Sequence, residues 1–87
     1  MGNPAWVVTE VIPRKDYTLL LTFEDGKNGV YDFRPNLSRS IFKKQQNIDF
    51  FMQAKALYGT VVWPDDSDIA PELLYEKSIP TNTDVDG

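Results

Sequence analysis

Three aspartates, Asp65, Asp66 and Asp68, stand within four residues of one another and are the first candidates for chemistry in this sequence. Carboxylate oxygens are the ligands that Ca²⁺ prefers in proteins. A calcium loop that began at Asp66 would need glycine at its sixth position and glutamate at its twelfth, where the sequence has Pro71 and Lys77. The spacing therefore excludes a calcium loop, and the sequence predicts no metal site.

Turn and helix chemistry explains the same segment. The residue before a proline is pushed to extended geometry, so the strand that leads to Trp63 should end at Pro64. Asp68 is in place to cap a helix over residues 70–77, in which Pro71 is tolerated in the first turn. We therefore predict one structural clasp that packs the final helix on a sheet, formed by Trp63, Pro64, Asp68, Pro71, Leu74 and Tyr75.

The chain contains no histidine and no cysteine. It therefore lacks an imidazole base, a thiolate nucleophile, the usual zinc ligands and any disulfide. Neighbouring carboxylates such as Glu24 and Asp25 flank turns and need no catalytic explanation. We expect that the protein is not an enzyme and that it has no catalytic residue and no cofactor. An enzyme that uses carboxylates is the third alternative.

Charge is unevenly distributed along the chain. Residues 1–64 carry eight basic and six acidic groups (+2), and residues 65–87 carry seven acidic groups and one lysine (−6). Net negative charge repels nucleic-acid phosphates, so a basic protein partner is favoured, with Asp65 and Asp66 as candidate contacts. A nucleic-acid-associated regulator is the alternative, and its candidate contacts are Arg34, Arg39, Lys43 and Lys44. A homodimer is a further alternative. No apolar run in the sequence is long enough to cross a membrane.

The first third of the sequence predicts a three-stranded antiparallel meander over residues 6–34. Its strands are expected at 6–12, 17–24 and 27–34, where β-branched and aromatic residues recur and apolar positions alternate with polar ones. Asp25-Gly26 predicts a type I′ hairpin turn, which needs positive φ at both residues. Asn28-Gly29 is expected to form a second kink or bulge.

The remaining elements are shorter. They are expected in the order short helices at about 40–53, two short strands at about 54–63 and a C-terminal helix at about 70–77. Asn47 should cap a helix that begins at the next residue, and Tyr58-Gly59 should form a turn between the two strands. The pattern indicates an α+β fold in a single domain at 1–76, followed by a flexible polar tail at 77–87.

Several of these segments together resemble a small bacterial family. The resemblance is carried by "DYTLLLTFEDG" at 16–26, "GVYDFRPNL" at 29–37, "IF" at 41–42 and "GTVVWPDDSDIAPELLYE" at 59–76. These blocks are similar to those of domain-of-unknown-function 2442. The resemblance implies an α+β fold and a cytoplasmic bacterial protein, and it implies no catalytic residue.

The resemblance also bears on partners. Genes of this family often lie beside genes of another family, domain-of-unknown-function 4160, in an arrangement that resembles toxin–antitoxin pairs. The leading hypothesis is therefore a protein-interaction module, in its most specific form the regulatory or antitoxin-like member of a two-protein system. The product of the neighbouring gene is then the expected partner.

Overall fold

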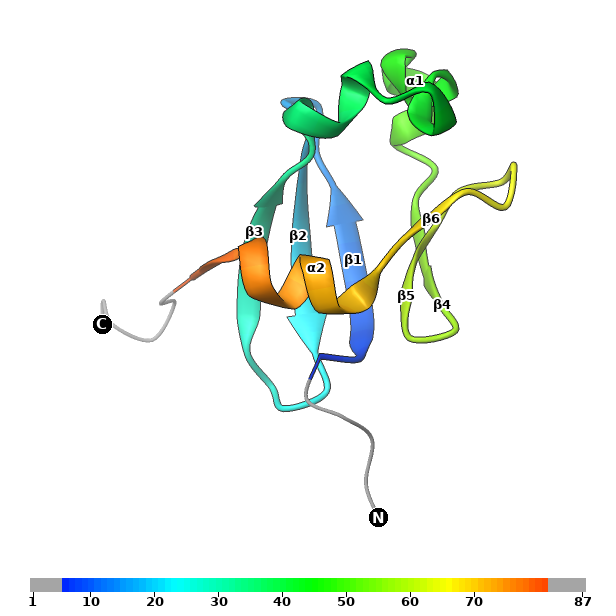
Figure 1. Cartoon of the computed structure of the whole chain (residues 1–87). Helices are drawn as coiled ribbons and strands as arrows, with labels where there is room; N and C mark the ends of the chain where they lie inside the picture. Colours follow the sequence, from blue (N-terminus) through cyan, green and yellow to red (C-terminus); the bar gives the residue numbers. More distant parts are fainter. Residues whose placement is uncertain (1–5, 82–87) are drawn as a thin grey trace.

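A computed structural model describes residues 6–81 and confirms the α+β fold: two antiparallel sheets with short helices between and beside them (Figure 1). The larger sheet has the strand order β1-β2-β3-β7, and its strands are β1 (Val8–Pro13), β2 (Thr18–Phe23), β3 (Asn28–Asp32) and β7 (Ile79–Pro80). The first three strands form the predicted meander. No helix in the described part of the chain is long and apolar enough to cross a membrane.

Strand β2 shows why the meander could be predicted from the sequence. Its burial alternates, with Leu19, Leu21 and Phe23 facing the core and the residues between them half-buried on the opposite face. The only irregularity in the pairing of β1 with β2 is a bulge between Val8 and Glu10.

The turn between β2 and β3 differs from the predicted type. Only Gly26 has a positive φ (+87°), whereas a type I′ turn would also need one at Asp25. The Gly26 N–H donates to Phe23 O at 2.9 Å, and Phe23 N–H donates to Lys27 O at 2.9 Å. This is a three-residue loop with glycine in the left-handed position, and Asp25 Oδ1 stabilises it by accepting from Lys27 N–H at 3.0 Å.

The predicted kink at Asn28-Gly29 is wrong, because both residues pair regularly with β2. Gly29 has a different reason to lack a side chain. A Cβ at this position would lie 2.6 Å from Ser78 Oγ, so glycine allows the chain that enters β7 to approach β3 closely.

The expected domain boundary at residue 76 falls too early. Gly29 and Val30 of β3 pair with Pro80 and Ile79 of β7, and Thr81 N–H donates to Asn28 O at 3.0 Å. Residues 77–81 thus continue the fold where the sequence predicts a tail. The rest of that tail, 82–87, lies outside the described residues.

Short helices follow β3. They are η1 (Arg34–Ser38), η2 (Ser40–Phe42), η3 (Lys44–Gln46) and α1 (Ile48–Phe51). The last three confirm the helices expected at about 40–53, whereas η1 lies before that range. Asn47 caps α1 as expected, since its Oδ1 accepts from Asp49 N–H at 2.9 Å. These helices supply Phe42 and Phe51 to the core.

The smaller sheet has the order β4-β5-β6, with strands β4 (Lys55–Leu57), β5 (Thr60–Val62) and β6 (Asp68–Ile69). The first two confirm the strands expected at 54–63, and β6 was not foreseen. Helix α2 (Pro71–Lys77) follows, begins at Pro71 as expected and crosses the face of the larger sheet (Figure 1).

The predicted cap of α2 is wrong. Ala70 occupies the N-cap position, and no side chain makes a capping hydrogen bond there. Asp68 instead pairs with Val62 in the smaller sheet. This pairing holds Asp68 in extended geometry two residues before the cap position, where it is exposed.

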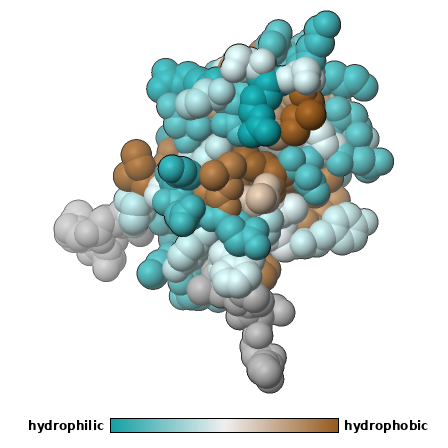
Figure 2. All heavy atoms as spheres, viewed as in Figure 1, coloured by the Kyte–Doolittle hydropathy of each residue, from teal (hydrophilic) through white to brown (hydrophobic). Residues whose placement is uncertain are grey.

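A single core joins the two sheets and α2. Its buried apolar residues are Val8, Leu19, Leu21, Phe23, Tyr31, Phe33, Phe42, Phe51, Ala54, Val61, Trp63, Ile69 and Leu74. On the side from which α2 is seen, apolar side chains reach the surface only in patches among hydrophilic ones (Figure 2).

Candidate functional site

Asp65, Asp66 and Asp68 lie at and beside the turn between β5 and β6. This turn, Pro64–Ser67, is called the acidic turn below. Trp63 N–H donates to Ser67 O at 3.0 Å and closes it, and Asp66 takes a left-handed φ of +69°. Asp65 Oδ1 accepts from Ser67 Oγ at 2.6 Å and from Ser67 N–H at 3.0 Å.

These contacts make Asp65 a structural residue. The hydrogen bond from the Ser67 hydroxyl, followed by that from the Ser67 N–H, lowers the pKa of Asp65, and the positive charge of Lys44 acts in the same direction. Gln45, which is fully buried, donates from Nε2 to Ser67 Oγ at 2.8 Å. A chain of hydrogen bonds therefore ties η3 to the acidic turn.

The acidic turn does not assemble a metal site within residues 6–81. No group of three or more metal-ligating side chains comes together there. Asp65 is engaged by Ser67, and Asp66 and Asp68 are exposed. What the turn offers is exposed negative charge on Asp66 and Asp68.

The residues predicted as a clasp lie in two sets of contacts. Trp63 is buried, and its ring packs against Phe33, Phe42 and Phe51 with centroid separations of 5.2, 6.0 and 6.1 Å. In α2, Leu74 is fully buried, while the half-buried Tyr75 meets Phe23 edge-on at 4.9 Å. That these residues act as one unit stays a prediction, and Asp68 is not part of a helix cap.

Two of the four basic candidate contacts have carboxylate neighbours. Arg34 Nε and Nη2 each donate to one oxygen of Asp32 at 2.9 Å, and this pairing lowers the pKa of Asp32. The charge of Lys44 acts on Asp65. Arg39 borders a separate depression together with Lys77. The positive charges of Arg34 and Lys44 are therefore partly offset, which weakens their attraction for phosphates.

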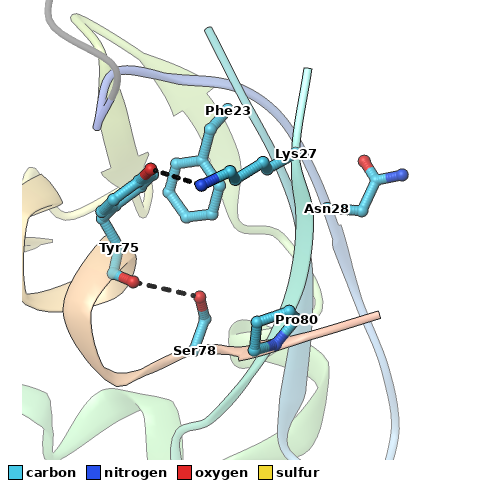
Figure 3. Close-up of a pocket in the computed structure, with 6 residues that line it drawn as sticks. All are labelled: Phe23, Lys27, Asn28, Tyr75, Ser78 and Pro80. Atoms are coloured by element: carbon cyan, nitrogen blue, oxygen red, sulfur yellow. Dashed lines mark hydrogen bonds between the residues drawn. The ribbon is translucent and has the colours of Figure 1, made fainter. Parts of the chain in front are cut away.

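A small cavity lies between α2 and the β2–β3 hairpin (Figure 3). Lys27 reaches toward Tyr75, and its Nζ donates to Tyr75 Oη at 3.4 Å, whereas Asn28 points away from the other lining residues. Tyr75 Oη donates in turn to Asp25 Oδ2 at 3.0 Å. The cavity holds about 110 Å³. Ligand pockets usually measure about 300–1,000 Å³, so these contacts serve to hold α2 on the hairpin.

The most exposed large hydrophobic side chain among the described residues is Tyr58, at the tip of the β4–β5 hairpin. It is 92% exposed, and its backbone has a left-handed φ of +55°. It borders a shallow depression of about 230 Å³ on the outer face of the smaller sheet. We call this area the hairpin-tip surface, formed by Lys55, Leu57, Tyr58, Val62, Pro64 and Asp66.

Only part of this surface could be recognised from the sequence. Tyr58-Gly59 was predicted as a turn, which the structure confirms, since both residues have positive φ and Leu57 pairs with Thr60 around them. The available signal was the aromatic residue itself. A tyrosine stands where asparagine or glycine would adopt the same backbone at lower cost.

Comparison with known proteins establishes the family of this chain and no property beyond it. The family described as Protein of unknown function (DUF2442) matches residues 8–80. The chain belongs to the DUF2442 family. No curated protein and no solved structure matches it.

The extent of the DUF2442 match agrees with the structure. It includes Ile79 and Pro80, so β7 lies within the family domain. It also covers the acidic turn and the hairpin-tip surface, which are therefore parts of the DUF2442 domain itself.

Proposed function

We propose that this DUF2442 protein is a protein-interaction module and that its partner binds the hairpin-tip surface. The observation that carries the proposal is the state of Tyr58, which combines a left-handed backbone with a side chain that is 92% exposed. A non-glycine residue in this conformation costs on the order of 1–3 kcal/mol. The fold recovers nothing through the exposed ring, so binding accounts best for the tyrosine.

The neighbours of Tyr58 suit a protein partner. Leu57 is exposed beside it, and the depression that they border continues to Val62 and Pro64. A tyrosine that becomes buried removes roughly 150–250 Å² from water, and tyrosines are enriched among the residues that dominate interface energies.

The charges near this surface indicate the chemistry of the partner. Asp66 borders the depression, and Asp68 is exposed on the adjoining strand. Only Lys55 offsets them among the residues that form the surface. We infer a partner that presents apolar side chains together with lysine or arginine, because such a surface complements both features.

In its specific form the proposal is a regulatory or antitoxin-like role in the bacterial cytoplasm. The partner is then the product of a neighbouring gene of the domain-of-unknown-function 4160 type. Support comes from the family resemblance and from the gene arrangement that it implies. A non-enzymatic role belongs to the same proposal, because the sequence has neither histidine nor cysteine.

The test measures binding to the purified product of the neighbouring gene by isothermal titration calorimetry. Tyr58→Gly is the informative variant, because glycine keeps the left-handed backbone and removes only the ring. We expect at least tenfold weaker binding with an unchanged or higher melting temperature. Ile41→Ala removes another exposed apolar side chain, located in η2, and should bind like the wild type.

Two results would count against the proposal. Wild-type affinity in Tyr58→Gly would show that the hairpin-tip surface is not the binding site. If the wild type neither binds this product, nor alters its activity on co-expression, nor recovers any partner from its host, the interaction module itself is refuted.

A further inference from the structure

The larger sheet has a second apolar surface, on the face opposite the core. Ile12, Leu20, Val30 and Ile79 are directly paired across β1, β2, β3 and β7, so they form one row on one face. Ile12 is 55% exposed and Ile79 is 70% exposed. Leu20 lies between Leu19 and Leu21 along β2, and those two point into the core. The row therefore faces away from α2.

This face is a broad, shallow depression of about 480 Å³. Glu10 and Arg14 line it on either side of Ile12, two residues before and two residues after it. Alternate residues of a strand point to the same side, which places the acidic, apolar and basic side chains in one line. Thr22 and Asn28 border the depression and join their side chains by a 3.0 Å hydrogen bond.

The order Glu10, Ile12, Arg14 is self-complementary. When two copies pack face to face about a twofold axis that passes near Ile12 and runs along the row Ile12–Leu20–Val30–Ile79, perpendicular to β1, their β1 strands run antiparallel across the interface. Ile12 then meets Ile12, and Glu10 of each copy faces Arg14 of the other. The apolar row and the two opposite charges thus match a second copy of the same surface without any further partner chemistry.

We propose that the open face of the β1-β2-β3-β7 sheet binds a second copy of this chain, with Ile12 at the twofold axis. This surface is separate from the hairpin-tip surface, so the inference goes beyond the proposed function. The strands have six, six, five and two residues, so at about 3.3 Å per residue and about 4.8 Å between strands the footprint is roughly 300 Å² per copy. That is less than half the usual value of about 800 Å² per partner, so the dimer is weak and depends on protein concentration.

Sedimentation equilibrium of the full chain over a wide range of concentrations tests the proposal. Glu10→Arg and Arg14→Glu each place like charges opposite one another at both ends of the interface, and each should weaken association at least tenfold. The double variant Glu10→Arg/Arg14→Glu restores opposite charges and should regain wild-type association. Glu24→Arg and Lys15→Glu make the same changes in net charge outside the depression and serve as controls.

Each outcome decides the proposal. Weakening by both single variants, rescue by the double variant and no effect of the controls support it. A wild type that is monomeric at every concentration overturns it, and so do single variants that associate like the wild type. Failure of the double variant to rescue overturns the twofold register. Tyr58→Gly should dimerise normally, so failure here is distinguishable from failure of the proposed function.

Discussion

The indole Nε1–H of Trp63 donates a hydrogen bond to the main-chain oxygen of Phe51 at 3.0 Å. This bond ties the residue that follows β5 to the last residue of helix α1. Trp63 also packs against the rings of Phe33 and Phe42, so one side chain joins the smaller sheet to the helical segment.

Trp63→Ala should bring the protein close to unfolding. Truncation of a buried aromatic side chain costs about 3–5 kcal/mol. A domain of this size has a total stability on the order of 4–13 kcal/mol. Urea denaturation should show a large loss for Trp63→Ala and a smaller one for Trp63→Phe, which keeps a ring but loses the hydrogen bond to Phe51. Equal losses in the two variants would contradict a role for ring packing.

Asp68→Ala and Asn47→Ala should behave differently, because only Asn47 caps a helix. Loss of a capping side chain costs about 0.5–2 kcal/mol, so Asn47→Ala should lower the melting temperature. Asp68 is exposed and makes no capping bond, so Asp68→Ala should change stability by no more than about 0.5 kcal/mol. If Asp68→Ala lost as much stability as Asn47→Ala, the result would support the capping role that the sequence predicted for Asp68.

Stability should fall in acid, because hydrogen bonds lower the pKa of several folded carboxyls. The carboxyls with lowered pKa values are those of Asp16, Asp25, Asp32 and Asp65. As the pH falls below their ordinary value of 3.8, the unfolded chain binds protons first. The stabilisation is therefore present above that value and is lost as the pH falls through the folded pKa values.

Urea midpoints at about pH 7 and about pH 3 measure this effect. Asp65→Asn keeps an oxygen that can accept from Ser67 but cannot ionise, so its loss of stability on acidification should be smaller than that of the wild type. A wild-type midpoint that is unchanged between the two pH values would contradict the prediction.

Gly29→Ala should destabilise the protein by clashing with Ser78. The added Cβ would lie 2.6 Å from Ser78 Oγ and 3.0 Å from Ser78 Cβ, and overpacking of this kind costs roughly 1–3 kcal/mol. The double variant Gly29→Ala/Ser78→Gly removes the obstructing side chain and should recover most of the loss. A double-mutant cycle measures the coupling, and strictly additive effects would place the strain elsewhere.

The parts of the fold that follow from local rules could be predicted from the sequence. Alternation of Leu19, Leu21 and Phe23 specified the second strand, and Asn47 marked the beginning of α1. The two-residue strands β6 and β7 could not be predicted, because two residues show no alternation. Asp68 was misassigned for a related reason. Its pairing with Val62 depends on residues outside the local sequence and overrides its capping tendency.

The two proposed interaction surfaces were less predictable than the fold. The sequence singled out the aspartates of the acidic turn, and the structure shows that Asp65 is occupied by Ser67. The hairpin-tip surface depends on the exposure of Tyr58, and the open face depends on the alignment of Ile12 with Ile79 across four strands. Exposure and alignment across strands are properties of the assembled sheet, which composition and spacing alone do not contain.

The pairing of β3 with β7 has a consequence for the order of folding. Strands β1 to β3 are neighbours in sequence and can pair through short loops. The pairing of Val30 with Ile79 joins residues far apart in the sequence, because Ile79 belongs to the last described element. We expect β7 to dock last and to detach first. In native-state hydrogen exchange, amide protons at this edge of the sheet should therefore exchange through local opening, well before those of β2.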